Sequence, residues 1–166
     1  MFQKILIALG DDPVAAEVLA QGLTLASQLR ATVLLLHVLN PLESHGFDTA
    51  GSPLVGGILP LVNDAAIAKY TAEWQNYEQQ GAARLQSYAA QATNLEIQAE
   101  ILQSFGDSGP TICTTAKNWG ADLIILGRNQ KSNWAEIFLG STSNDVLHHA
   151  HCSVLTIQPS TTKAAR

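Results

Sequence analysis

Short apolar runs alternate with helical patterns along most of the chain. Residues 2–9, 32–39 and 123–126 are dominated by long aliphatic side chains, which is typical of parallel strands buried on both faces. Residues 13–30 carry apolar side chains at three- and four-residue spacing, which predicts an amphipathic helix. Asp12 and Pro13 precede that helix as its expected N-cap and first-turn proline.

The second half of the chain continues the alternation. The helical spacing returns over residues 67–92, and residues 95–101 then alternate apolar side chains with Glu and Gln. This period of two predicts a strand with one wet face, which suits the edge of a sheet. Gly109-Pro110 opens an expected helix that ends at Gly120. A short helix over 140–150 and a last strand over 152–157 complete the pattern.

The order of these elements predicts one α/β domain over residues 1–160, with long loops at 40–62 and 128–139 and a frayed tail at 161–166. Strands that alternate with helices form a doubly wound parallel sheet with helices on both faces, because the crossovers are right-handed. Ligands of such sheets bind beyond the carboxyl ends of the strands. The pattern leaves the order of the strands open.

Composition narrows the class of protein. Hydrophobic residues make up 46% and charged residues 14%, as in a globular chain, and the net charge of −5 argues against a nucleic-acid partner. The longest apolar run, 31–39, is far shorter than a membrane span. Cys113 and Cys152 are too few for a disulfide framework, so we expect a cytoplasmic protein.

A candidate phosphate cradle follows the strand at 123–126. Leu126 and Gly127 end that strand, and Gly140 precedes a helix that opens with three hydroxyl residues: Ser141, Thr142 and Ser143. Glycine lets the backbone approach an anion, and a helix N-terminus offers free N–H groups and a positive dipole end. The alternative is a strand-end glycine, a loop and an ordinary serine N-cap.

The same residues carry a family resemblance. The segments at 120–127, 139–141, 146–150 and 152–155 (GADLIILG, LGS, VLHHA and CSVL) resemble the C-terminal half of universal stress proteins, whose signature is G-2x-G-9x-G-[ST]. Residues 4–8, 36–38 and 106–107 are similar to the family as well. The resemblance implies a five-stranded parallel sheet of order 3-2-1-4-5, a homodimer and an adenine nucleotide (AMP, ADP or ATP).

Most signature positions are matched. Gly127, Gly140 and Ser141 fall on the nucleotide-binding signature, and Val38 falls on the position whose backbone meets the adenine. The second signature glycine is replaced by Gln130, whose side chain stands where the family has bare backbone. We therefore expect AMP or ADP to bind at least as tightly as ATP. The aspartate that ends the first strand in many members is replaced by Gly10, with Asp11 displaced by one residue.

Asp11 and Asp12 are a second candidate. Adjacent carboxylates at a strand end can hold Mg²⁺ or a ribose. Asp12 is the expected helix cap, and Asp11 is then the expected ligand of the nucleotide and of any Mg²⁺.

Other suggestive residues have structural interpretations. His148 and Cys152 have a spacing close to that of helical metal sites, but helix gives way to strand between them, so we expect His148, His149 and His151 to form a polar helix end. His37 is expected to be a hydrogen-bonded core histidine. The aromatic residues Tyr70, Trp74, Tyr77 and Tyr88 are expected to pack along one helix face. Trp134 could cover a nucleotide or a partner.

Four functional hypotheses follow. The first is a nucleotide-binding stress or signalling module that dimerises through the last strand, at Val154, Leu155, Thr156 and Ile157. The second is a slow ATPase that uses Asp11 with Mg²⁺. The third is a phosphoacceptor domain, which the missing Lys after the last strand disfavours. The fourth is a ligand-free dimerisation module that acts through protein partners.

Overall fold

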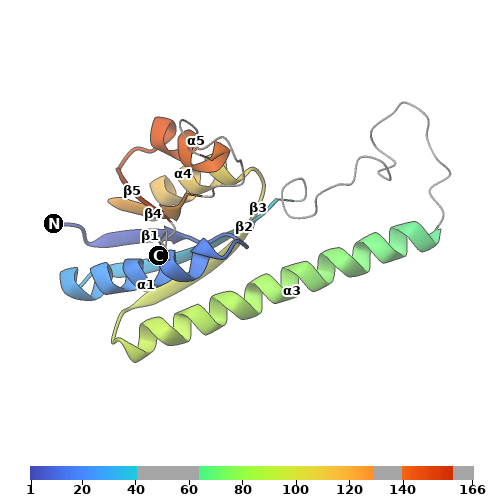
Figure 1. Ribbon diagram of the computed structural model, residues 1–166, viewed down its shortest axis with the longest axis horizontal. Coiled ribbons are helices and arrows are strands. Elements are labelled where there is room, and N and C mark those ends of the chain that lie inside the picture. Colours follow the sequence, from blue (N-terminus) through green and yellow to red (C-terminus); the bar gives the residue numbers. More distant parts are fainter. Residues whose placement is uncertain (41–63, 129–139, 159–166) are drawn as a thin grey trace, which may run out of the picture.

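A computed structural model describes residues 1–40, 64–128 and 140–158 (Figure 1). Strands and helices alternate through these residues as the hydrophobic pattern predicts. The elements are β1 Lys4–Ala8, α1 Val14–Leu29, β2 Thr32–Leu39, α3 Asp64–Asn94, β3 Ala99–Phe105, α4 Ser108–Trp119, β4 Leu123–Gly127, α5 Ser141–His149 and β5 Ser153–Ile157.

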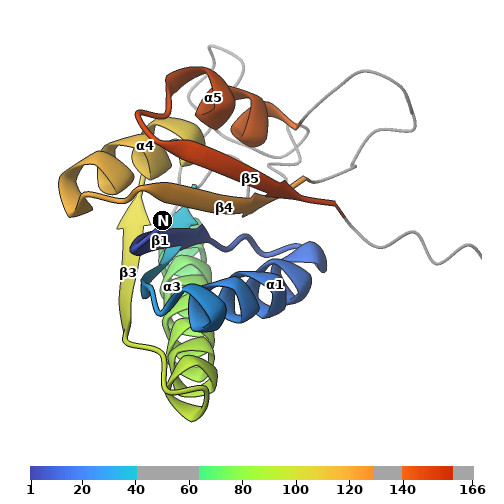
Figure 2. The same cartoon turned by 90° about the vertical axis from the view of Figure 1, so that its left-hand side faces the viewer.

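The five strands form one parallel sheet in the order β3-β2-β1-β4-β5, which confirms the order that the family resemblance implies. In the centre of the sheet, Ile7 of β1 pairs with Leu35 of β2 and with Ile125 of β4. Helices α1 and α3 cover one face, and α4 and α5 cover the other (Figure 2). The winding therefore reverses between β1 and β4, where such sheets bind their ligands.

Each face of the sheet carries its own hydrophobic core. Successive residues of a strand point to opposite faces. Ile5 and Ile7 therefore pack with α1, whereas Leu6 and Ile124 pack with α4 and α5. All four of these side chains are fully buried. The apolar runs are thus strands buried on both faces, as predicted.

The third strand is not where the alternating pattern placed it. The prediction was residues 95–101, but β3 runs from Ala99 to Phe105. Helix α3 continues to Asn94, and the chain then turns through Glu96, whose φ is 58°. The N–H of Ile97 bonds to the carbonyl oxygen of Ala92 at 3.0 Å, so the buried Ile97 belongs to a helix-ending turn. The edge position predicted for this strand is confirmed.

The start of α1 also differs from the prediction. The N-cap is Pro13 with φ −61° and ψ −19°, and no side chain caps the helix. The first turn is closed instead by the backbone, since the N–H of Ala15 bonds to the carbonyl oxygen of Asp12 at 3.1 Å. Asp12 is therefore not a capping residue. Gly120 ends α4 in the left-handed conformation, with φ 77°, as predicted.

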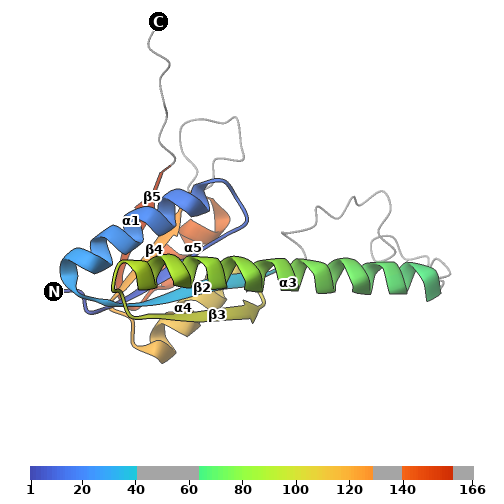
Figure 3. The ribbon, with the colours of Figure 1, turned by 90° about the horizontal axis from the view of Figure 1, so that it is seen from below.

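Helix α3 is much longer than the strands and projects past the carboxyl end of β2 (Figure 3). Its aromatic residues do not share one environment. Tyr88 packs against the hydrophobic core between the sheet and α1, as expected. Trp74 instead contacts Tyr77 and Phe105, at ring-centroid distances of 5.7 and 5.9 Å. The side chain of Tyr70 lies outside the described residues, as does Trp134. None of the described helices is both long and apolar enough to cross a membrane.

Candidate functional site

A cavity of about 770 Å³ lies at the carboxyl ends of β1 and β4. Nine of the ten candidate binding residues line it: Gly10, Asp11, Val38, Leu126, Gly127, Gly140, Ser141, Thr142 and Ser143. The tenth, Gln130, lies outside the described residues. Strand topology thus gathers side chains that are up to 133 residues apart (Gly10 to Ser143) around one cavity.

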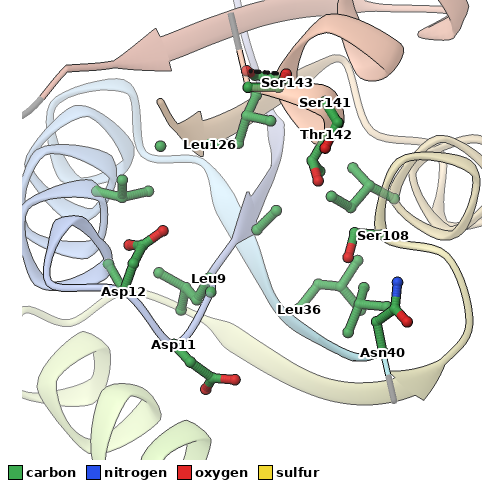
Figure 4. Close-up of a pocket in the computed structure, with 18 of the residues that line it drawn as sticks. Leu9, Asp11, Asp12, Leu36, Asn40, Ser108, Leu126, Ser141, Thr142 and Ser143 are labelled. Atoms are coloured by element: carbon green, nitrogen blue, oxygen red, sulfur yellow. Dashed lines mark hydrogen bonds between the residues drawn. The ribbon is translucent and has the colours of Figure 1, made fainter. Parts of the chain in front are cut away.

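The N-terminus of α5 forms one side of the cavity (Figure 4). Its N-cap is Gly140, which has no side chain to occupy the first N–H groups, and its first turn carries no acidic residue. Ser141 and Thr142 add hydroxyls at the same place. The hydroxyl of Ser143 is used within the helix, since it donates to the carbonyl oxygen of Gly140 at 3.0 Å. Free N–H groups and hydroxyls of this kind are suited to contact with an anion.

Gly127 packs closely against α1. A Cβ at this position would lie 3.1 Å from methyl carbons of both Val14 and Val18. The end of β4 therefore approaches α1 closely at the floor of the cavity.

Leu36, Val38 and Ile112 give the cavity an apolar wall. Leu126 adds apolar surface beside Ser143, at the α5 end (Figure 4). Two polar residues that the sequence analysis did not single out, Asn40 and Ser108, lie beside the apolar wall. Asn40 directly follows β2, and Ser108 follows the turn after β3. Both therefore lie at the carboxyl ends of strands, where the predicted topology places a ligand site. A flat apolar ring with polar edges fits such a wall.

Asp11 receives three side chains from two elements. Nε2 of His37 on β2 lies 3.1 Å from Oδ1 of Asp11, and the Tyr77 hydroxyl donates to Oδ2 at 2.5 Å. The Arg84 guanidinium pairs with the same carboxylate. Tyr77 and Arg84 both belong to α3, so Asp11 ties the loop after β1 to the long helix.

Gln103 extends this network and fixes the tautomer of His37. Its Nε2 donates to the carbonyl oxygen of Glu78 at 3.2 Å and lies 3.3 Å from Nδ1 of His37. Nδ1 is therefore the acceptor, and Nε2 carries the proton toward Asp11. His37 is 4% exposed, which confirms the predicted hydrogen-bonded core histidine.

The network also sets the charge of Asp11. Burial alone would raise the pKa of this carboxyl. The hydrogen bonds from His37 and Tyr77, together with the charge of Arg84, outweigh burial and hold the pKa well below its usual range. A carboxylate already paired with a guanidinium is a poor ligand for Mg²⁺, because the metal would have to displace or lie beside another cation. The residues around Asp11 do not fit the metal role.

Asp12 lies on the α1 side of the cavity, while Asp11 is turned away from Ser141 and Thr142, toward α3 (Figure 4). Both acids line the cavity, but their surroundings differ. Asp11 is bound by side chains of β2 and α3, whereas the side chain of Asp12 neither caps α1 nor makes a hydrogen bond to another described residue.

The histidines at and just after the end of α5, namely His148, His149 and His151, do not line this cavity. His149 contacts Asp145, with Nδ1 2.9 Å from both its carbonyl oxygen and its Oδ1. Cys152 is half-buried between α4 and β5, and burial followed by the nearby Asp122 raises the pKa of its thiol. Among residues 1–40, 64–128 and 140–158, no group of His, Cys, Asp and Glu is arranged to hold a metal.

Comparison with known proteins identifies the family. The model of the universal stress protein family matches residues 1–158. The chain belongs to the universal stress protein family. Universal stress protein Sll1388 of Synechocystis sp. is 33% identical over 157 residues, which cover 95% of this chain and 98% of that protein.

Solved structures share the fold. The hypothetical protein MJ0577 superposes with a TM-score of 0.73 at 20% identity, over 98% of this chain and 99% of that chain. A universal stress protein in complex with cAMP gives a TM-score of 0.65 at 14% identity, over 95% of this chain and 97% of that one. The Archaeoglobus fulgidus protein in complex with dAMP gives 0.58 at 18% identity, over 94% and 98%.

Proposed function

We propose that this universal stress protein is a single domain, residues 1–160, that binds an adenine nucleotide in the cavity between β1 and β4. The observation that carries the proposal is the pairing of two different walls across one cavity. The α5 N-terminus at Gly140, Ser141 and Thr142 suits a phosphate, and the wall at Leu36 and Val38 suits a planar base. The complexes of structural neighbours with cAMP and dAMP support an adenine ligand.

Calorimetry with AMP, GMP and ribose 5-phosphate tests this proposal. We expect AMP to bind and ribose 5-phosphate to bind at least about tenfold more weakly, because it cannot use the apolar wall. Equal affinity for AMP and GMP would contradict adenine selectivity. Mass spectrometry of the small molecule that co-purifies with the protein identifies the ligand independently.

We further propose that the protein acts as a homodimer through β5. This strand lies at the edge of the sheet, and its candidate contact residues differ in exposure. Leu155 is 39% exposed and points outward, whereas Ile157 is buried within its own domain and contributes only backbone to an edge contact. An apolar edge strand pairs readily with a second copy across a two-fold axis.

A pair of matched substitutions tests the dimer. Leu155→Lys places a charge in the proposed interface, while Leu102→Lys changes a residue of equal exposure, 40%, on the opposite edge strand β3. We expect sedimentation to show a dimer for the wild type and Leu102→Lys, and a monomer for Leu155→Lys. A dimer that survives Leu155→Lys and dissociates in Leu102→Lys would move the interface to β3.

A role in stress response or signalling follows from family membership and remains part of the proposal, as does the cytoplasmic location expected from the sequence. No observation among the described residues favours the ATPase hypothesis, because Asp11 is paired with Arg84.

A further inference from the structure

Two helix N-termini face each other across the cavity, and their charges differ. The α5 end has Gly140 as its N-cap and no acid in its first turn. The α1 end has Asp12 and Pro13 at its start and Glu17 in its first turn, and proline has no N–H to offer. Both ends line the same cavity, through Ser141 and Thr142 on one side and Asp12 and Pro13 on the other (Figure 4). Only the α5 end is suited to an anion.

The carboxylate of Asp12 is uncompensated within the part of the chain that the structure describes. No hydrogen bond or ion pair to its side chain occurs there, in contrast to Asp11, which Arg84 neutralises. The described residues that line the cavity include no Lys or Arg. Arg128, which follows Gly127, is not part of the lining, and Lys131 lies outside the described residues.

We propose that Asp12 is a charge filter that restricts the site to adenosine monophosphates, linear or cyclic, and disfavours adenosine polyphosphates. The inference rests on the proposed nucleotide function and names the ligand class of that site. One phosphate group is accommodated by the N–H groups and hydroxyls of the α5 end. Each further phosphate adds negative charge to a cavity that already holds a carboxylate, and repulsion between like charges in a partly buried site is far less screened than in water.

This role differs from that of Gln130. The effect expected of Gln130 from the sequence is the loss of the signature glycine, and a glutamine carries no charge, so that effect would not depend on salt. The effect of Asp12 is electrostatic, so it grows with the charge of the ligand and weakens as the salt concentration rises.

A charge series of ligands tests the filter. Adenosine, AMP and ATP are titrated by calorimetry in EDTA, at low and at high salt, into the wild type, Asp12→Asn and Asp107→Asn. Asp107 is the matched control, because it also precedes a helix without capping it by its side chain, and it does not line the cavity. Thermal unfolding of each variant shows that the fold persists.

We expect adenosine to bind all three proteins equally. Asp12→Asn should tighten ATP by roughly tenfold relative to AMP, as one relieved charge repulsion of about 1.4 kcal/mol predicts. The gain should shrink at high salt, and Asp107→Asn should leave the ratio unchanged.

Each contrary result has its own meaning. If adenosine and AMP bind but the ratio of ATP to AMP affinity is the same in the wild type and in Asp12→Asn, the filter is refuted and the proposed function stands. A change in that ratio as large in Asp107→Asn as in Asp12→Asn also refutes it, since net charge would then explain the effect. If neither adenosine nor AMP binds the wild type, the proposed function fails, and the filter fails with it.

Discussion

Gly81 is the position at which α3 meets two polar side chains of the sheet, and replacing it with alanine tests that close approach. A Cβ there would lie 2.3 Å from Nε2 of Gln103 and 2.7 Å from Nδ1 of His37. Gln103 can swing away, because the contact is at the tip of a flexible side chain. His37 cannot move so easily, since it is buried and bonded to Asp11.

Opposing terms set the expected change in stability. Alanine gains about 0.8–1.0 kcal/mol over glycine in a helix interior. Forcing a methyl group into a packed site costs about 1–3 kcal/mol. Displacing Gln103 also breaks its bonds to Glu78 and His37, which are worth about 0.5–1.5 kcal/mol each. We therefore expect Gly81→Ala to lower the free energy of unfolding by about 1–5 kcal/mol, or the melting temperature by roughly 2–20 °C.

Urea unfolding followed by circular dichroism measures this change. Ser87→Ala, at an exposed position in the same helix, is the control and should be neutral or slightly stabilising. The double variant Gly81→Ala with Gln103→Ala should recover part of the loss, because it removes the nearer of the two clashes. If Gly81→Ala is as stable as Ser87→Ala, then α3 does not approach β2 and β3 as the structure has it.

Three further outcomes are expected. Gly140→Val should abolish nucleotide binding in calorimetry with little change in thermal stability, because a branched side chain at the α5 N-cap blocks the approach of the anion. Unchanged affinity would place the phosphate elsewhere. Asp11→Asn should lower the free energy of unfolding at neutral pH, and the difference from the wild type should shrink as the pH falls below about 4, because a carboxylate with a lowered pKa stops stabilising the folded state once it is protonated. A difference in unfolding free energy that is constant with pH would refute the network. Cys113 should react with a thiol reagent more slowly than a free cysteine at pH 8, since burial and, to a lesser extent, the negative charge of Asp145 raise the pKa of its thiol. A rate equal to that of free cysteine would contradict the raised pKa.

The central strands were within reach of the sequence because burial on both faces leaves a simple pattern, whereas their order came from the family resemblance alone. The neighbours of Leu34 and Ile124 along their strands are also buried, so the strands appear in the sequence as unbroken apolar runs. The edge strand β3 was displaced by four residues for the opposite reason. In the turn after α3, Leu95 and Ile97 alternate with polar residues, as in a strand. The positive φ of Glu96 and the backbone bond from Ile97 to Ala92 make this segment a turn, and the sequence pattern shows neither.

Most of the cavity lining was also predictable, because parallel strands bring their carboxyl ends to one edge whatever the side chains are. The residues from α3 were not. Tyr77 reaches the site from a helix 66 positions beyond Asp11, and its spacing along α3 is the same as that of a residue in ordinary helix packing. No local pattern distinguishes a tyrosine that packs from one that donates a hydrogen bond to a distant carboxylate.

The roles of Asp11 and Asp12 show what decides between two neighbouring acids. Either residue can cap a helix or face a ligand when judged from the local sequence alone. The choice is made by Arg84 and His37, which lie 73 and 26 positions away and together hold Asp11 against α3. The first turn of α1 is closed by the backbone bond from Ala15 to Asp12, so the side chain of Asp12 is left beside the cavity. The charge that a ligand meets in this site is thus determined by a contact on the far side of the loop. Removing Arg84 would therefore change the charge at the proposed nucleotide site by freeing Asp11, although Arg84 itself does not line the cavity.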